Sequence, residues 1–221
     1  VTNDVAVVML TEVDYRTGRK HDAPAITKVV HDAGAVMIWD LAHSAGAIEV
    51  DVAATNCEFA IGCTYKYLNA GPGAPAFIYV RPDLADQIDP ALSGWLGHDS
   101  PFAFEPRYAP GQGIERMRVG TPPVLQMAAL DAALYIWDRV EMSELRAACL
   151  KLSDLFITEV EMRCPDLQLV TPRDHAMRGS QVSFAFENGY AAMQAVIDRG
   201  VIGDFRAPNI MRFGMTPLYL D

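Results

Sequence analysis

A strand–helix–strand pattern at the start of the chain most constrains its fold. Residues 5–10 form a short, fully apolar run, as expected of a strand that is buried on both faces. Asp22 can then cap a helix that has Pro24 in its first turn, and Gly34 can end that helix. A second apolar run, residues 35–39, follows at once. This spacing predicts a parallel βαβ unit and therefore an α/β fold.

The next hundred residues continue the layer and then lose periodicity. Residues 59–64 and 74–80 are further strand candidates, and residues 83–88 are a short helix candidate. Residues 94–118 are rich in glycine, proline and aromatic residues and show no period. So long an irregular stretch within a compact domain is more often functional than accidental.

The second half of the chain has a different pattern. Pro122 and Pro123 can open a helix with an apolar side, and Ser143 can cap a longer helix. We expect a domain boundary near residue 140, with a mostly parallel layer in residues 1–140 and a smaller α+β unit in residues 141–221. The elements expected in that unit are strands at 167–170, 182–186, 201–205 and 210–213 and a helix at 190–199.

Composition argues against several classes of protein. The net charge of −10 argues against a nucleic acid or an anionic membrane as partner, since both favour a basic face. No apolar run approaches the roughly 20 residues of a membrane span. The four cysteines are scattered, which is typical of reduced thiols in a cytoplasmic protein. The five histidines show no zinc-site spacing, which argues against a metal hydrolase.

Asp40 and Lys66 are the residues that point to chemistry. Lys66 lies between strand-like segments in an apolar setting, where burial lowers the pKa of an amine and makes it nucleophilic. Asp40 ends a predicted strand, at the edge where α/β layers bind ligands. Pyridoxal phosphate (PLP) needs such a pair, a lysine to attach it and an acid to keep its ring nitrogen protonated. The alternatives are a lysine that reaches solvent and an aspartate that caps a helix.

The residues around this pair resemble the kynureninases, a family of fold-type I PLP enzymes. Related cysteine desulfurases and class V aminotransferases usually carry Ser-His-Lys at the lysine, so Thr64-Tyr65-Lys66 favours kynureninase. The matching segments keep their order along nearly the whole chain. They are Asp-Leu-Ala-His-Ser-Ala-Gly at 40–46, Thr-Tyr-Lys-Tyr-Leu-Asn-Ala-Gly-Pro-Gly at 64–73, Gly-Trp-Leu-Gly-His at 94–98, Arg-Val-Gly-Thr-Pro-Pro at 118–123 and Arg-Phe-Gly-Met-Thr-Pro-Leu-Tyr at 212–219.

The resemblance implies a role for each matching residue. Lys66 would hold PLP and move protons, and Asp40 would pair with the pyridine nitrogen. Arg212 would bind the substrate's α-carboxylate through two hydrogen bonds, with Arg206 as a second candidate. Further cofactor contacts would come from Thr11, His43 and Tyr65 of the same subunit, and from Trp95 and Thr121, which would reach the phosphate in the partner subunit of a homodimer.

Each of these residues also has a structural alternative. His43 could be a surface histidine or a core histidine with its hydrogen bonds satisfied, and Trp95 could anchor a loop. Tyr65 and Tyr67 could be packing residues. Arg212 could form a salt bridge with Asp204.

The implied reaction is hydrolysis of L-kynurenine, or its 3-hydroxy form, to anthranilate (or 3-hydroxyanthranilate) and L-alanine, in tryptophan catabolism and NAD biosynthesis. The alternatives are a cysteine desulfurase-like or aminotransferase-like PLP enzyme, and an inert fragment or scaffold. The family has a further N-terminal region, and we expect this chain to be a fragment that begins after that region. We therefore expect residues 1–140 to be the C-terminal part of the large PLP-binding domain, residues 141–221 to be an incomplete small domain, and the chain alone to bind PLP weakly or not at all.

Overall fold

The first strand–helix–strand unit forms as the sequence predicts. In the computed structural model, which describes residues 1–220, it comprises β1 (Val7–Thr11), α1 (Ala23–Asp32) and β2 (Val36–Asp40). The side chain of Asp22 caps α1 by accepting a hydrogen bond from the backbone N–H of Ala25 at 3.0 Å. β1 and β2 are parallel, and their last residues, Thr11 and Asp40, lie side by side.

Two further strands complete this first sheet. After α2 (Val52–Thr55), β3 (Phe59–Cys63) joins β2 in parallel and β4 (Ala76–Val80) joins β3 antiparallel, in the order β1-β2-β3-β4. The sheet packs on α1 through a core that includes Met37 and Trp39, and the Trp39 indole donates to the Thr27 hydroxyl at 2.9 Å. The predicted mostly parallel α/β layer is therefore present.

The two faces of this sheet differ in exposure. Met37 and Trp39 are buried on the face that packs on α1. The opposite face carries Val7, Met9 and Ile78, whose exposed fractions are 51%, 53% and 47%. An apolar surface of this kind is typical of a contact with further protein.

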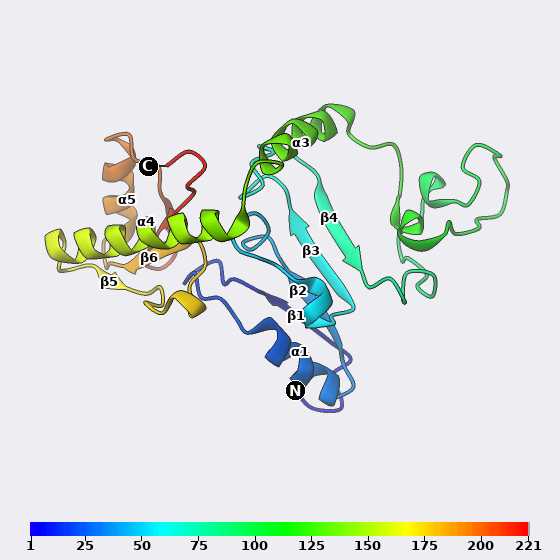
Figure 1. The fold of residues 1–221 in the computed structure, drawn as a ribbon, viewed down its shortest axis with the longest axis horizontal. Coiled ribbons are helices and arrows are strands. Elements are labelled where there is room, and N and C mark those ends of the chain that lie inside the picture. Colours follow the sequence, from blue (N-terminus) through cyan, green and yellow to red (C-terminus); the bar gives the residue numbers. More distant parts are fainter. Residues whose placement is uncertain (221) are drawn as a thin grey trace.

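Residues 81–123 form an arm that runs out from the end of β4 and away from the rest of the molecule (Figure 1). It contains two short 3₁₀ helices, η1 (Trp95–Gly97) and η2 (Gly113–Met117), and agrees with the predicted irregular stretch. The helix predicted at 83–88 is wrong, because these residues form turns. The side-chain amide of Gln87 donates to the carbonyl of Asp83, which is the acceptor that a helical Gln87 N–H would need.

The second half of the chain pairs two helices with an antiparallel sheet. α3 (Val124–Trp137) and α4 (Met142–Arg163) precede a sheet of order β5-β6-β8-β7, and α5 (Gly189–Ile197) packs on β7 and β8. The strands are β5 (Gln168–Leu169), β6 (Gln181–Ala185), β7 (Asp204–Arg206) and β8 (Ile210–Gly214), and η3 (His175–Met177) lies between β5 and β6. Cys149 and Ile157 of α4 pack on Phe184 of β6.

Two details of the helices differ from the expectation. Glu141 occupies the N-cap position of α4 with an extended backbone, so Ser143 lies inside the first turn and does not cap the helix. In α3 the apolar side is largely exposed: Leu125 is 82% exposed, and Ala133 is the buried residue of this helix. No helix within residues 1–220 combines the length and apolarity needed to cross a bilayer.

Candidate active site

The candidate site begins at the carboxyl edge of the first sheet. Because β1, β2 and β3 are parallel, their C-terminal ends meet at one edge. Thr11 and Asp40 are paired at that edge, and Lys66 lies in a bend that follows β3 directly. The sheet topology therefore brings Thr11, Asp40 and Lys66 to the same end of the sheet, although Thr11 and Lys66 are 55 positions apart in the sequence.

Asp40 uses one carboxylate oxygen to hold the turn that follows β2. Its Oδ1 accepts a hydrogen bond from the backbone N–H of Ala42 at 2.8 Å, so the capping alternative describes part of its role. This bond fixes the orientation of the carboxylate at the sheet edge. It is the one hydrogen bond that the Asp40 carboxylate makes within residues 1–220, and the other oxygen, Oδ2, accepts none there.

Lys66 and Arg212 line one cavity of about 330 Å³, in the size range of small-molecule sites. The cavity lies between the first sheet and the second, since Lys66 follows β3 and Arg212 belongs to β8. Two other predicted site residues, His43 and Tyr65, line it as well. The remaining lining residues are Tyr67, Gln181, Asp204, Phe213, Gly214, Thr216 and Tyr219.

His43 is neutral at physiological pH in this setting. Burial, together with the nearby cations Lys66 and Arg212, lowers its pKa from 6.5 to about 4, against the opposing effect of Asp40 and Asp14. A neutral imidazole has one nitrogen that donates and one that accepts. His43 can therefore bind a hydroxyl or an anion without adding a charge to the cavity.

Lys66 and Tyr65 lie against each other at the cavity. The Lys66 Nζ is 5.5 Å from the centroid of the Tyr65 ring, within the range of a cation–π contact. The Tyr65 side chain is 49% exposed. Its phenol is therefore accessible to a ligand.

Arg212 makes the salt bridge that was the alternative to its substrate-binding role. Its guanidinium binds the Asp204 carboxylate and donates to the carbonyl of Tyr15, and only 11% of its side chain is exposed. Its Nε is buried and has no partner within residues 1–220. Asp204 also pairs with Arg206 at 2.9 Å. The salt bridge holds Arg212 at the cavity wall and leaves part of its donor fork unused.

Trp95 and Thr121 are close to each other but do not line this cavity. A Cβ on Gly120 would lie 3.8 Å from the Trp95 indole nitrogen, so the indole reaches the residue next to Thr121. The two segments are pressed together, because a Cβ on Gly94 would clash with the Val119 carbonyl at 1.8 Å. Both belong to the arm, and neither is among the described residues that line the Lys66 cavity.

Sequence reasoning missed several residues of the cavity. Gln181 donates from its side-chain amide to the Tyr15 carbonyl at 2.8 Å, the same carbonyl that Arg212 binds. Tyr67 was assigned only a packing role, although its side chain lines the cavity. No local pattern distinguishes these residues, because their positions depend on contacts between the two sheets.

Comparison with known proteins identifies relatives of the chain. A family model described as the kynureninase C-terminal domain matches residues 145–221. A kynureninase from Pseudomonas fluorescens is 55% identical over 99% of this chain and 53% of that protein. A kynureninase from Deinococcus radiodurans is 52% identical over 100% of this chain and 54% of that protein. The resemblance to the kynureninase family is confirmed. The chain spans about half the length of the kynureninases it matches.

Solved structures agree with the predicted fold. An apo cysteine desulfurase from Thermococcus onnurineus matches with a TM-score of 0.80 at 19% identity, over 95% of this chain and 55% of that chain. A variant of the lyase C-DES with glycine covalently linked to its PLP cofactor matches with a TM-score of 0.82 at 20% identity, over 100% of this chain and 58% of that chain. The fold-type I PLP-enzyme fold is therefore confirmed, whereas the kynureninases are much closer in sequence than these structural relatives.

Proposed function

We propose that the chain is the lysine-bearing part of a PLP-dependent kynureninase that cleaves the Cβ–Cγ bond of L-kynurenine, 3-hydroxykynurenine or both. One observation carries the proposal: Lys66, His43, Tyr65 and Arg212 line one cavity beside the strand edge that bears Asp40. The 50–55% identity to kynureninases favours this activity over that of a desulfurase or an aminotransferase.

The side chains present fit PLP. Lys66 has the primary amine that the cofactor's aldehyde requires, and the Asp40 carboxylate can hold a proton on the pyridine nitrogen. Neutral His43 and the exposed phenol of Tyr65 can donate hydrogen bonds to the ring oxygen and the phosphate, and Thr11 can supply a hydroxyl. When bound, PLP supplies an electron sink for negative charge that develops at the substrate's Cα.

The chain's own residues would transfer the proton and bind the substrate. Lys66 Nζ would take the proton from the substrate's Cα as a general base. Arg212 would bind the α-carboxylate, with Arg206 beside the same Asp204 as second candidate. The overall reaction consumes one water and gives anthranilate, or its 3-hydroxy form, and L-alanine.

Trp95 and Thr121 would act in a second subunit. They lie together on the arm, outside the Lys66 cavity of their own chain, which supports a homodimer in which each arm reaches the partner's cofactor phosphate. The acidic net charge supports a small-molecule substrate rather than a nucleic acid. Scattered cysteines, free within residues 1–220, support a cytoplasmic location.

The decisive experiment loads the complete protein with PLP and reduces it with borohydride. We expect mass spectrometry to find the reduced cofactor on Lys66, and the protein to release L-alanine from kynurenine in preference to acting on cysteine. Lys66→Ala removes both the labelled peptide and the activity, because Lys66 supplies the one lysine amine among the described residues that line the cavity.

The matched control is Lys151→Ala, which removes an exposed lysine from α4. It retains labelling and turnover. An unlabelled Lys66 in the complete protein would refute the cofactor assignment. A labelled protein that acts on cysteine and not on kynurenine would refute the proposed substrate.

A further inference from the structure

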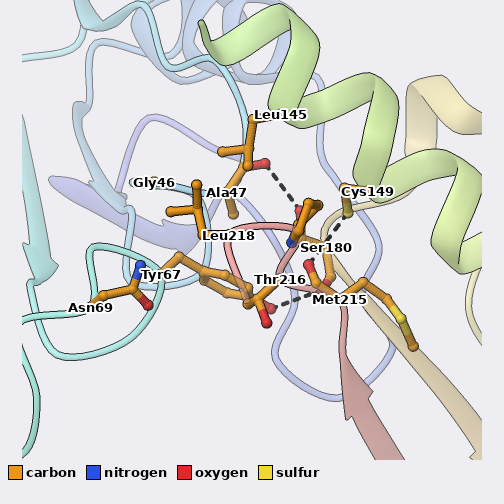
Figure 2. A pocket seen from close by; sticks show the side chains of 11 residues that line it. Gly46, Ala47, Tyr67, Asn69, Leu145, Cys149, Ser180, Met215, Thr216 and Leu218 are labelled. Atoms are coloured by element: carbon orange, nitrogen blue, oxygen red, sulfur yellow. Dashed lines mark hydrogen bonds between the residues drawn. The ribbon is translucent and has the colours of Figure 1, made fainter. Parts of the chain in front are cut away.

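Tyr67 occupies the junction between the two sheets, one residue beyond Lys66. Its side chain lines the Lys66 cavity on one side and a second, small cavity of about 10 Å³ on the other. Its hydroxyl donates a hydrogen bond to the backbone carbonyl of Ser180 at 3.1 Å (Figure 2). This bond joins positions 113 residues apart, and it connects the loop that carries Lys66 to the start of β6.

Ser180 connects Tyr67 to two other segments, the end of β8 and the turn that follows β2. Its carbonyl also accepts a hydrogen bond from the Met215 N–H at 2.8 Å, which extends the pairing of β6 with β8. Its hydroxyl donates to the carbonyl of Ala47 at 3.0 Å, in the turn that carries His43 (Figure 2). Arg212 pairs with Ser183 in the same two strands.

The turn that carries His43 also touches the Lys66 loop directly. Gly46 has a φ of +81°, and a Cβ there would lie 2.8 Å from the Tyr67 carbonyl. A side chain at this position would separate the two segments. The Tyr67 backbone is therefore in close contact with Gly46, and the Tyr67 phenol is hydrogen-bonded to Ser180.

The phenol of Tyr67 is a donor and not a proton-transfer group. Burial raises its pKa, the nearby Cys149 adds to that effect, and Arg212 opposes it. The hydroxyl therefore keeps its proton throughout the neutral range. Its chemistry at this junction is to donate one hydrogen bond to a neutral backbone carbonyl.

We propose that Tyr67 is a positioning residue, whose hydroxyl bond to Ser180 sets the placement of Lys66 relative to Arg212. Lys66 and Arg212 come from different sheets, and their relative placement decides whether a substrate held by its carboxylate presents its Cα to the amine. This inference rests on the proposed function for the roles of Lys66 and Arg212. In this role Tyr67 acts through the placement of Lys66, although its side chain also lines the cavity.

The test compares Tyr67→Phe with Tyr79→Phe in the complete protein. Tyr79 belongs to β4, and its hydroxyl makes no hydrogen bond within residues 1–220. Tyr79→Phe therefore removes a tyrosine hydroxyl oxygen without loss of a hydrogen bond. We expect kcat of Tyr67→Phe to fall roughly tenfold, because small misplacements of reacting groups carry large rate costs. Amide hydrogen exchange should rise several-fold in residues 64–70 and 178–183. Tyr79→Phe should leave kcat and this exchange unchanged.

A double-mutant cycle separates positioning from a general structural effect. In an Arg212→Lys background, where bidentate carboxylate binding is already lost, Tyr67→Phe should lower kcat by less than threefold, against the roughly tenfold fall in the unmutated background. Full additivity, or unchanged exchange in residues 64–70, would overturn the inference. If the unmutated protein does not cleave kynurenine, the proposed function fails, and the exchange measurement alone decides whether Tyr67 couples the two sheets.

Discussion

Burial lowers the pKa of His43 most, and two cations that are distant from it in sequence lower that pKa further. Lys66 and Arg212 come from separate sheets, and together with burial they lower the pKa of His43 to about 4. The unfolded chain binds a proton at His43 below about pH 6.5, whereas the folded chain does not until about pH 4. The unfolded state thus binds more protons in this window, and the free energy of unfolding falls as pH falls through it.

This difference predicts a pH-dependent effect of His43→Gln. Between pH 6.5 and pH 4 the unmutated protein should lose about 1–2 kcal/mol more stability than the variant, a value reduced for solvent screening of a partly exposed imidazole. Urea denaturation of both proteins without added cofactor, at several pH values, measures it. Parallel pH profiles would show that His43 titrates normally.

Sequence reasoning predicted the placement of the candidate residues whose position follows from strand order. Asp40 and Lys66 stand at the ends of apolar runs, and parallel strands bring such ends together. It missed the positions of Tyr67 and Gln181 at the cavity, because these depend on hydrogen bonds to Ser180 and Tyr15 that no local pattern encodes. The salt bridge from Arg212 to Asp204 was foreseen only as one of two alternatives.

At the scale of elements, an ion pair with one buried partner connects α4 to the residue that follows η3. Arg178 is 1% exposed and its guanidinium pairs with Asp154 of α4, which also binds His175 at 2.8 Å. Arg146 of α4 donates to the carbonyls of His175 and Gly179. These bonds hold the segment that leads into Ser180 and β6.

Asp154→Asn should therefore destabilise the second half of the chain by about 2–3 kcal/mol. It leaves the Arg178 charge buried without an anion, and the half-exposed position of Asp154 keeps the cost below that of a fully buried pair. Urea denaturation measures the loss. Asp166→Asn is the matched control, since Asp166 is exposed and forms no ion pair within residues 1–220, and it should change stability by less than about 0.5 kcal/mol. Equal losses in the two variants would contradict the role of Arg178.

The elements themselves were largely predictable, and the exceptions have local causes. Apolar runs and glycine or proline breaks placed every strand to within a few residues. The helix expected at 83–88 is absent, because the Gln87 N–H donates to the Leu84 carbonyl, three residues back, in a turn. The apolar side of α3 was predicted from spacing, but spacing does not tell what covers it, and Leu125 is largely exposed.

At the scale of the whole molecule, the arm and the loop that carries Lys66 lie at opposite ends of the first sheet. β3 and β4 are antiparallel, so the loop after β3 and the arm after β4 leave the sheet at opposite ends. Phe102 and Phe104 of the arm are 74% and 85% exposed. An exposed aromatic arm that holds Trp95 and Thr121 away from its own cavity suits a contact with a second copy of the chain.

Mixed dimers test this arrangement directly. One parent carries Lys66→Ala, and the other carries Trp95→Ala together with Thr121→Ala, so that each parent dimer has two defective sites. If the arm acts in the partner subunit, a mixed dimer has one site with both an intact Lys66 and an intact arm. Random mixing makes half of the dimers mixed, so activity should recover to about a quarter of that of the unmutated protein. If the arm served its own subunit, every site in the mixture would remain defective, and kynurenine turnover after mixing would stay at the mean of the two parents.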